Sequence, residues 1–565
     1  FSAFKIILMV QFDEDKQKLK IDDLHKKEEE ELAQLLASRY GISYIDLLTT
    51  AINTDALGLI KEEDARRGKL AAFGMVDKKI KIAVLSPKSD TTKEVLTELT
   101  ERGYTTQIHM TSTASLEKAW NTYKDVAFAH ETKAGALEIS NQQILEVINQ
   151  VKSVADIKKL IEELLASNKS YRISKILEII LAGSLSIGAS DVHIEPEEKI
   201  VRIRYRLDGV LTEILTFDSE TFGLLLSRIK LLSGLKLNVK QDAQDGRFSI
   251  KLVDTDIEIR TSVLPGAYGE SIVLRVLNPK NIAVPLEELG IHPKLLKLLE
   301  QETERPDGMI LTTGPTGSGK TTTLYAFLRR VYSPGIKIIT IEDPIEYHLP
   351  GIVQTQTNDK GYNFLDGLRS ALRQDPDVIM VGEIRDAETA AIAINSAQTG
   401  HLVFSTLHTN NAAGAFPRLI DLKINPKVLT SAINISLAQR LLRKLCIHCK
   451  KEITIEGDAK TIIDKVIVTL PPDEKSQLTN TSKMWVPAGC EKCNSTGYKG
   501  RIGIYEAILT DEAVEQVVIN NPSEREIKKA AIPQGILTME QDGVIKILSG
   551  VTALDELARV IDVTE

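Results

Sequence analysis

Residues 309–321 read Met-Ile-Leu-Thr-Thr-Gly-Pro-Thr-Gly-Ser-Gly-Lys-Thr, and this stretch decides the fold of the largest part of the chain. The apolar run Met309 to Thr313 predicts a strand, and a helical pattern begins near Thr321. A Gly-x-x-x-x-Gly-Lys-Thr loop between a strand and a helix is typical of a phosphate-binding loop, and a chance glycine-rich turn does not explain this order. The expected nucleotide-binding residues are Gly314, Pro315, Thr316, Gly317, Ser318, Gly319, Lys320, Thr321 and Thr322.

Each part of this loop has a chemical task. Backbone N–H groups and the start of the helix face the phosphates. Lys320 reaches the β and γ phosphates, and the Thr321 hydroxyl binds Mg²⁺. Beyond Pro285 the chain alternates apolar strands with long helices, which predicts a parallel sheet covered on both faces. The expected strands are Met309 to Thr313, Lys337 to Ile341, Val378 to Val381 and Leu402 to Thr406.

Two acidic clusters follow strands of this sheet. Glu342-Asp343-Pro-Ile-Glu346 comes after Lys337 to Ile341, where Pro344 stops the strand. Glu383 comes after Val378 to Val381, at a buried strand end where a carboxylate needs a cation such as Mg²⁺. The carboxyl ends of parallel strands form the ligand crevice, so both clusters predict groups for hydrolysis. The alternative for either cluster alone is a helix-capping or surface acid.

Two histidines flank the strand Leu402 to Thr406. His401 precedes it, and His408 follows it together with Asn410. Groups at the carboxyl end of this strand could sense the γ phosphate, whereas a lone histidine in such a place is more often a structural donor.

The four cysteines form two Cys-x-x-Cys pairs, Cys446 with Cys449 and Cys490 with Cys493. Four thiolates in two such pairs predict a closed tetrahedral zinc site. Disulfides and an exposed catalytic dithiol are the alternatives, and a reducing compartment disfavours the first of them. This usage of cysteine suggests a cytoplasmic protein.

A second unit, from about Tyr171 to Asn278, has strands of alternating polarity, as in Val201 to Leu207, and predicts antiparallel sheet. Near its end, two strand-like runs are joined by a turn-rich segment, which is a hairpin signature. A symmetric hairpin centred between Ala267 and Tyr268 places Arg260 directly opposite Arg275, with Cβ atoms about 5 Å apart. Two cations so close need an acid, such as Glu258 or Glu270, or a bound anion.

Composition limits the function classes. Hydrophobic residues make up 43% of the 565 residues and charged residues 26%, which is ordinary for folded domains. The net charge of -8 supplies no basic field for nucleic acid or an anionic membrane. The early apolar run Phe4 to Val10 predicts a strand, because it falls far short of the ~20 residues that a membrane-spanning helix needs.

The chain resembles the secretion ATPase superfamily, which powers type II secretion and type IV pili. The resemblance rests on four motifs in order: the phosphate loop, Ile341 to Glu346, Val381 to Asp386 and Thr399 to Asn410. It covers nearly the whole chain. It implies an N-terminal secretion-ATPase domain (1–135), a helical linker (136–168), a PAS-like α+β domain (169–280), a RecA-like phosphate-loop ATPase domain (281–445), a tetracysteine zinc-binding subdomain (446–500) and a C-terminal helical region (501–565).

The resemblance also implies roles for single residues. Glu383 would be the metal-side acid, Glu346 the catalytic base, and His401 and His408 the histidine sensors. Arg260 and Arg275 would be arginine fingers that reach the nucleotide. The cofactors would be ATP, Mg²⁺ and Zn²⁺.

The same resemblance suggests an assembly and a place in the cell. The enzyme would be a homohexamer at the inner face of the cytoplasmic membrane, associated with the membrane through a platform protein and cytoplasmic components. In the ring, the second domain of one subunit would pack on the motor domain of its neighbour. Residues 26–38 lack the repeated Arg-Leu-Gly-x-x-Leu helices that bind cyclic di-GMP in some relatives, so docking to partners is the expected role of the N-terminal domain.

Pilus extension is the favoured function, and a type II secretion motor is the alternative. The tetracysteine pattern disfavours a pilus-retraction enzyme, because the retraction relatives generally lack it. A nucleic-acid translocase would need a basic channel or stacking aromatic residues, and aromatic residues are only 5%. A scaffold that uses ATP only for assembly would leave Glu346 and Glu383 idle.

Overall fold

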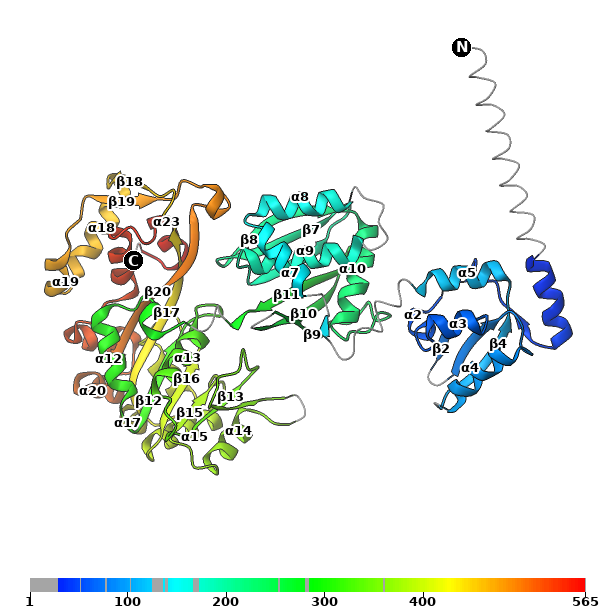
Figure 1. The fold of residues 1–565 in the computed structure, drawn as a ribbon. Coiled ribbons are helices and arrows are strands. Elements are labelled where there is room, and N and C mark those ends of the chain that lie inside the picture. Colours follow the sequence, from blue (N-terminus) through cyan, green and yellow to red (C-terminus); the bar gives the residue numbers. More distant parts are fainter. Residues whose placement is uncertain are drawn as a thin grey trace, which may run out of the picture. The chain divides into compact units, whose positions relative to one another are not determined.

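The computed structural model (Figure 1) describes residues 29–50, 52–76, 79–101, 103–123, 136–137, 141–165, 172–252, 255–279, 284–358 and 361–563. The strand expected at Phe4 to Val10 lies outside these residues. The chain divides into two compact units, Phe1–Glu138 and Ile139–Glu565. In the described part of the chain, no helix has both the length and the apolar character that a membrane span requires.

The first unit is a small α/β module around a sheet with the strand order β1-β4-β3-β2. β1 and β3 run parallel to β4, and β2 is antiparallel to β3. The strands are β1 (Ser43–Tyr44), β2 (Leu70–Val76), β3 (Lys79–Val84) and β4 (Thr105–Met110). The helices are α2 (Thr54–Leu57), α3 (Glu62–Arg67), α4 (Asp90–Glu101) and α5 (Thr113–Asn121), and a further helix covers 29–40.

The second unit begins with an α+β domain whose antiparallel strands follow the order β9-β10-β11-β6-β7-β8. In β7, Val201, Ile203 and Tyr205 are fully buried, and the arginines between them are partly exposed, as the alternation predicts. The strands are β6 (Asp191–Pro196), β7 (Val201–Leu207), β8 (Val210–Phe217), β9 (Gln244–Lys251), β10 (Asp256–Gly266) and β11 (Gly269–Leu277). Its helices are α9 (Arg172–Ser186) and α10 (Ser219–Leu232).

The helices α7 (Asn141–Gln150) and α8 (Val154–Leu165) lie in the segment expected to be a helical linker. Both helices pack against α9 of the α+β domain. Ile157 lies so close to Gly183 of α9 that a Cβ atom there would be 2.9 Å from the isoleucine side chain. The physical reason is the apolar stripe of the two helices, which needs a partner to be buried.

The motor part of the unit is a sheet with the order β14-β13-β15-β16-β12-β17-β20. All neighbouring strands of this sheet are parallel except β17 and β20. Successive residues of a strand point to opposite faces of the sheet, and each face packs against its own apolar core. The parallel strands are β12 (Gly308–Thr313), β13 (Ile338–Glu342), β14 (Val353–Gln356), β15 (Val378–Val381), β16 (Leu402–Leu407) and β17 (Ile433–Leu445). The helices before β17 are α12 (Pro293–Thr303), α13 (Lys320–Val331), α14 (Phe364–Leu372), α15 (Ala387–Gln398), α16 (Ala415–Asp421) and α17 (Pro426–Ala432).

The region 501–565 was expected to be helical, but it begins inside the long edge strand β20 (Tyr498–Leu509). β20 pairs antiparallel with β17, so the two strands extend the sheet beyond β12. The sequence of β17 is rich in Leu, Ala, Gln and Arg, which favour helix. Pairing with two strands overrides this local preference. The helices that follow are α20 (Glu512–Asn520), α21 (Glu524–Ala531), α22 (Met539–Leu548) and α23 (Leu554–Val560).

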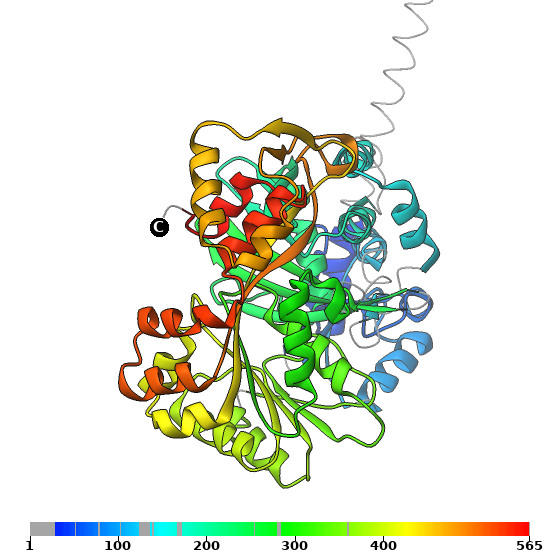
Figure 2. The same cartoon turned by 90° about the vertical axis from the view of Figure 1, so that its left-hand side faces the viewer.

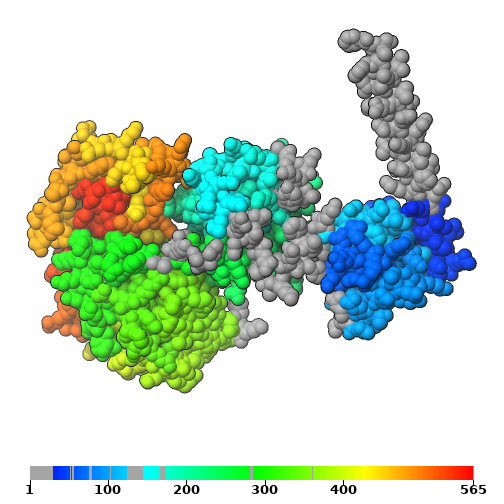
Figure 3. Space-filling view, viewed as in Figure 1, coloured from blue at the N-terminus to red at the C-terminus, as the bar shows by residue number. Residues whose placement is uncertain are grey.

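The cysteine-bearing segment lies between β17 and β20 in the sequence. It contains β18 (Lys451–Thr454), α18 (Gly457–Thr469), α19 (Pro472–Gln477) and β19 (Lys483–Val486). α22 packs against α18 and β19, and α23 packs against β17 (Figure 2). On the face in Figure 3, the red C-terminal residues lie between the orange inserted segment and the green motor residues. The C-terminal helices therefore join the inserted segment to the motor sheet.

Candidate active site and metal centre

The phosphate loop lies between β12 and α13, where the sequence predicted it. Gly314, Gly317 and Gly319 have φ angles of 147°, 80° and 94°, which L side chains rarely adopt. At Gly314 a Cβ atom would also be 2.5 Å from Ser318 Oγ. The Lys320 ammonium donates hydrogen bonds to the Gly314 carbonyl at 2.8 Å and the Pro315 carbonyl at 3.2 Å. Burial lowers the pKa of Lys320, and the nearby Glu383 carboxylate opposes this effect.

A cavity of about 960 Å³ opens above the loop. Its walls include acids that follow β13 and β15, cations of the α+β domain, and side chains of β17, β20 and α23. Its volume is at the upper end of the range found for small-molecule sites. Of the catalytic residues predicted from the sequence, Glu346, Glu383, Arg275 and His408 line it.

Glu346 lies in the loop after β13 and faces a cation of the α+β domain. Arg260 Nη1 is 3.5 Å from Glu346 Oε2, and Arg260 Nη2 donates to the Ile345 carbonyl at 2.6 Å. Burial raises the pKa of the Glu346 carboxyl, and the positive charges of Arg260 and Arg275 oppose the rise. A half-buried carboxylate with a raised pKa at the phosphate end of the cavity has the properties of a general base.

Glu342, the first acid of the same cluster, has a different environment. The sequence placed it in the loop, but it is the last residue of β13 and is only 3% exposed. Its carboxylate accepts hydrogen bonds from Tyr325 Oη, from Thr340 Oγ1 at 2.5 Å and from Gln354 Nε2 at 3.0 Å. Since Gln354 also accepts a hydrogen bond from the Leu349 backbone at 2.6 Å, Glu342 anchors the loop that carries Glu346.

Glu383 follows β15 and faces two cations. Its carboxylate contacts the Arg385 guanidinium, and His408 Nε2 is 3.2 Å from Glu383 Oε2. Its side chain is 15% exposed. Mg²⁺ prefers carboxylate, hydroxyl and phosphate oxygens, so the Glu383 carboxylate and the Thr321 hydroxyl in one cavity fit this ion.

The two predicted histidine sensors lie at opposite ends of β16. His408 follows the carboxyl end of the strand, where it lines the cavity and contacts Glu383. His401 precedes the amino end, and its Nδ1 donates a hydrogen bond to the Ser396 carbonyl at 3.1 Å. The structure therefore brings His408 into the site of this chain and leaves His401 outside the cavity that the described residues form.

The hairpin register predicted from the sequence is confirmed, because Arg260 pairs directly with Arg275 across β10 and β11. Three further pairs extend this pair across the sheet: Arg260 with Arg247 of β9, Arg275 with Asp191 of β6, and Asp191 with Arg206 of β7. Directly paired residues share a face, so four arginines and one aspartate form a ladder across the sheet.

The acids that accompany the two arginines were only partly predicted. Arg260 Nε contacts Glu258 Oε1 at 3.0 Å, as one alternative proposed. Arg275 instead contacts Asp191 Oδ1 at 3.2 Å, and Glu270 pairs with the buried Lys230 at 2.6 Å. Asp191 was missed because β6 is distant in sequence.

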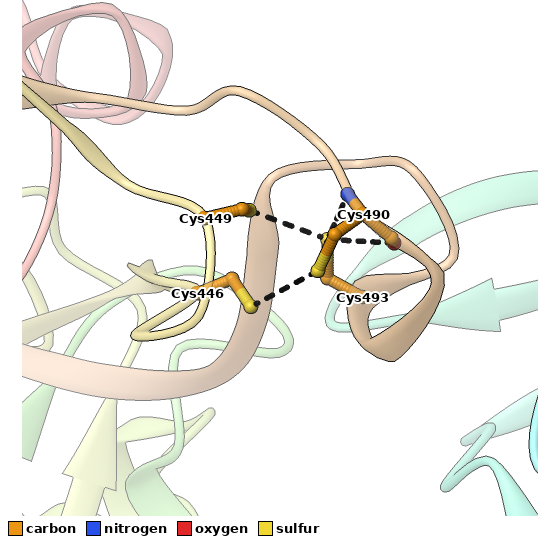
Figure 4. Close-up of side chains that lie close together, drawn as sticks. All are labelled: Cys446, Cys449, Cys490 and Cys493. Atoms are coloured by element: carbon orange, nitrogen blue, oxygen red, sulfur yellow. Dashed lines mark hydrogen bonds between the residues drawn. The ribbon is translucent and has the colours of Figure 1, made fainter.

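The four cysteines converge, as the two Cys-x-x-Cys pairs predict. Cys446 and Cys449 of one loop face Cys490 and Cys493 of another (Figure 4). All four thiols are free, and the four sulfur atoms lie within 4.8 Å of one another. The Sγ–Sγ distances are 3.9 Å for Cys446 and Cys490, 3.8 Å for Cys449 and Cys493, and 3.6 Å for Cys490 and Cys493.

This spacing can be tested against a zinc ion. Four sulfurs in a tetrahedron, each about 2.3 Å from a central zinc, are about 3.8 Å apart, so the observed distances fit. Burial raises the pKa of the Cys493 thiol, but hydrogen bonds from the backbone N–H groups of Cys490 and Gly497 outweigh it and lower the pKa to about 7. Those donors favour the thiolate that a metal needs.

Comparisons with known proteins identify the family of this chain. A model of the family described as type II/IV secretion system protein matches residues 166–559. The chain belongs to this family. The type IV pilus assembly ATPase PilB of Myxococcus xanthus is 35% identical over 532 residues, which cover 94% of this chain and 91% of that protein. The type II secretion system protein E of Aeromonas hydrophila is 43% identical over 400 residues, which cover 71% of this chain and 77% of that protein. A crystal structure of the ATPase DotB of Legionella pneumophila has a TM-score of 0.47 and 22% identity, and covers 68% of this chain and 95% of that one.

In this type II/IV secretion system protein, further cavity residues were not predicted from the sequence. Arg440 of β17 donates to the Gln439 carbonyl at 2.9 Å and to the Asn410 carbonyl at 2.7 Å, and so ties the loop after His408 to the edge of the sheet. Arg501 of β20 and Arg559 of α23 also line the cavity. No sequence signal marks these two residues, because they follow the cysteine segment in the sequence and reach the site only through the fold.

Proposed function

We propose that the chain is a hexameric motor that uses the free energy of MgATP hydrolysis to extend a type IV pilus at the cytoplasmic face of the inner membrane. It is an ATP-hydrolysing member of the type II/IV secretion system proteins. The observation that carries the proposal is that the phosphate loop, Glu346, Glu383 and Arg275 line one cavity. Arg260 joins this group through its contact with Glu346.

The proposed chemistry assigns one task to each group. The phosphate loop and Lys320 bind the β and γ phosphates, and Thr321 and Glu383 hold Mg²⁺, which neutralises the developing charge when it is bound. Glu346 accepts a proton from the attacking water, which its raised pKa favours. Arg260 and Arg275 stabilise the charge that builds on the transferred phosphoryl group. His408 orients Glu383 through their contact. His401 receives no role in hydrolysis within its own chain.

The tetracysteine cluster is proposed to hold one structural zinc. Its fit rests on the sulfur spacing and on the donors to Cys493. The zinc would link the loop after β17 to the loop before β20. It would take no part in hydrolysis.

The remaining parts of the proposal concern organisation. Residues 169–280 form a PAS-like domain, 281–445 a RecA-like ATPase domain, and 1–135 a docking domain for a platform protein and its cytoplasmic partners. The antiparallel α+β fold and the parallel sheet support the first two assignments. In this chain the hairpin meets Glu346 of the same polypeptide, so each subunit would supply its own arginine fingers. Contacts between subunits would then control whether the cavity closes.

A type II secretion motor is the second candidate. The 43% identity to the protein E of Aeromonas hydrophila favours it, but that similarity covers only 71% of this chain. The similarity to the pilus ATPase of Myxococcus xanthus covers 94%, and a match of that extent favours the pilus. A nucleic-acid translocase is disfavoured by the net charge of -8.

A genetic experiment separates the two candidates. The gene is deleted in its own host, and surface pili are counted by electron microscopy while secreted proteins are measured in the medium. Pilus extension predicts loss of pili with normal secretion, restored by the wild-type gene and not by Glu346→Gln. Loss of secretion with normal pili would establish the alternative.

A further inference from the structure

The C-terminal part of the chain supplies one wall of the nucleotide cavity. The wall consists of Leu441 on β17, Arg501 on β20, and Arg559 and Val560 on α23. Arg501 is exposed, and its side chain has no ion-pair partner within the part of the chain that the structure describes. The backbone beside it is anchored to the α+β domain, because the Gly500 N–H donates to Asp208 at 2.8 Å.

The strand order indicates which half of a nucleotide this wall meets. The phosphate loop follows β12, and the groups proposed for hydrolysis follow β13, β15 and β16, which all lie on one side of β12. Leu441 and Arg501 lie on the other side, on β17 and β20. A nucleotide with its terminal phosphate toward Glu346 therefore extends its ribose and base toward the C-terminal wall.

The wall has the chemistry of a base-binding surface. Leu441 and Val560 offer apolar contact, and planar guanidinium groups stack on aromatic faces. Leu441 is also close to the phosphate loop, since a Cβ atom at Gly319 would be 3.5 Å from its side chain. A base that leaves the loop in this direction passes Leu441, and the two arginines line the same cavity.

Arg559 is oriented by a buried carboxylate. Glu556 is 0% exposed and accepts two hydrogen bonds from the Arg559 guanidinium, at 2.9 and 2.7 Å. On its other side it accepts three from Arg443, at 2.9, 2.9 and 2.7 Å. Glu556 thus fixes two arginines at once.

Arg443 continues this chain of contacts to the cysteine cluster. Its guanidinium lies 4.1 Å from the ring centre of Tyr498, whose hydroxyl donates to Asp555 next to Glu556. Tyr498 follows Gly497, whose N–H donates to Cys493 Sγ at 3.3 Å and whose carbonyl accepts from the Cys446 N–H at 2.9 Å. The contacts run without a gap from the cysteines to Arg559.

We propose that Arg501 and Arg559 bind the base and ribose half of the nucleotide, and that the tetracysteine cluster positions Arg559 through Tyr498, Arg443 and Glu556. This inference rests on the proposed nucleotide site. It makes Arg559 a nucleotide-binding residue and Glu556 a positioning residue. The cluster would then tune nucleotide affinity although it lies outside the cavity.

Calorimetric titration with ADP and with inorganic pyrophosphate, each with Mg²⁺, tests the first half of the proposal. Arg559→Ala and Arg501→Ala should each weaken ADP binding about three- to tenfold and leave pyrophosphate binding unchanged, because a stacked guanidinium contributes about that much. Arg525→Ala, on the exposed surface of α21, is the matched control and should match the wild type. Unchanged ADP affinity in both cavity variants, or an equal loss for pyrophosphate, would overturn the assignment.

Lys320→Ala separates this inference from the proposed function. It should weaken both ligands, because it removes a phosphate contact. A wild type that binds neither ligand would refute the nucleotide site itself. If the wild type binds both ligands and the ADP affinities of Arg559→Ala and Arg501→Ala are unchanged, only the proposed role of the C-terminal wall is refuted.

The second half is tested by a double-mutant cycle on ADP affinity. Cys490→Ser should weaken ADP binding in the wild type and add nothing in Arg559→Ala, because the two changes act through one side chain. Retained pyrophosphate affinity shows that the motor core of each variant is folded. Equal losses from Cys490→Ser in both backgrounds, or no loss in the wild type, would show that the cluster does not act through Arg559.

Discussion

Replacement of Arg260 by alanine is the perturbation whose effect follows most directly from the site. The guanidinium makes three contacts, with Glu258 Oε1 at 3.0 Å, with the Ile345 carbonyl at 2.6 Å and with Glu346 Oε2 at 3.5 Å. It is held on both sides, so little reorganisation is needed when charge builds on a phosphoryl group beside it. Arg260→Ala removes the charge and the fixed geometry together.

The size of the effect can be worked out from its position. The side chain is 23% exposed, so an effective dielectric constant of about 20 is appropriate. In the proposed role the guanidinium comes within about 4 Å of the transferred phosphoryl group, and a unit charge at that distance contributes about 4 kcal/mol. Since 1.36 kcal/mol corresponds to a factor of ten, kcat should fall about 10³-fold. ADP affinity should change little, because the phosphate loop binds the remaining phosphates.

The assay is phosphate release from saturating MgATP, together with ADP titration and size-exclusion chromatography of the same samples. Arg247→Ala is the matched control, because Arg247 pairs with Arg260 across the sheet but, among the described residues, has no hydrogen bond or ion pair with Glu346 or the Ile345 carbonyl. The control should hydrolyse ATP at the wild-type rate. Turnover of Arg260→Ala near that rate, in an assembly of normal size, would refute the role of Arg260.

Three further predictions concern pH, metal and stability. A general base works when it is deprotonated, so kcat/KM should rise as the pH increases through the pKa of Glu346. The positive charge of Arg275 lowers this pKa, so Arg275→Ala should move the acid limb of the pH profile to higher pH. An unshifted limb would contradict the assignment of the base. Elemental analysis should find about one zinc per chain and none in Cys490→Ser, and a metal-free wild type purified without chelator would exclude the site. Glu342→Ala should lower the free energy of unfolding of the motor domain by about 2–5 kcal/mol in urea titrations, because Tyr325 and other buried donors lose their acceptor. An unchanged urea midpoint of unfolding would show that the hydrogen bonds to Glu342 do not stabilise the domain.

Local chemistry made parts of the site predictable from the sequence. The strand, loop and helix around Lys320 follow from glycine positions and apolar periodicity over a short stretch. The register of Arg260 with Arg275 follows from the symmetry of a hairpin with a two-residue turn. The convergence of the cysteines follows from two short repeats of the kind that binds metal.

Other parts depend on contacts that no short stretch encodes. The strand Ile433–Leu445 has the composition of a helix and becomes a strand because it pairs on both edges. Glu342 was expected in the loop after its strand, but it is the last residue of β13 and is buried at the cavity wall, where its carboxylate accepts hydrogen bonds from side chains of α13 and β14. Asp191 and Arg559 reach the cavity from strands and helices far away in the sequence, so only the tertiary structure brings them to the nucleotide.

The central claim is that one cavity of this chain hydrolyses ATP with Glu346 as the base. The most direct measurement is the rate of phosphate release from MgATP by the purified wild type and by Glu346→Gln, with ADP affinity measured on the same samples. The account predicts steady turnover in the wild type, a loss of at least about 10²-fold in the variant, and nearly equal ADP affinities. Equal turnover in the two proteins would contradict it.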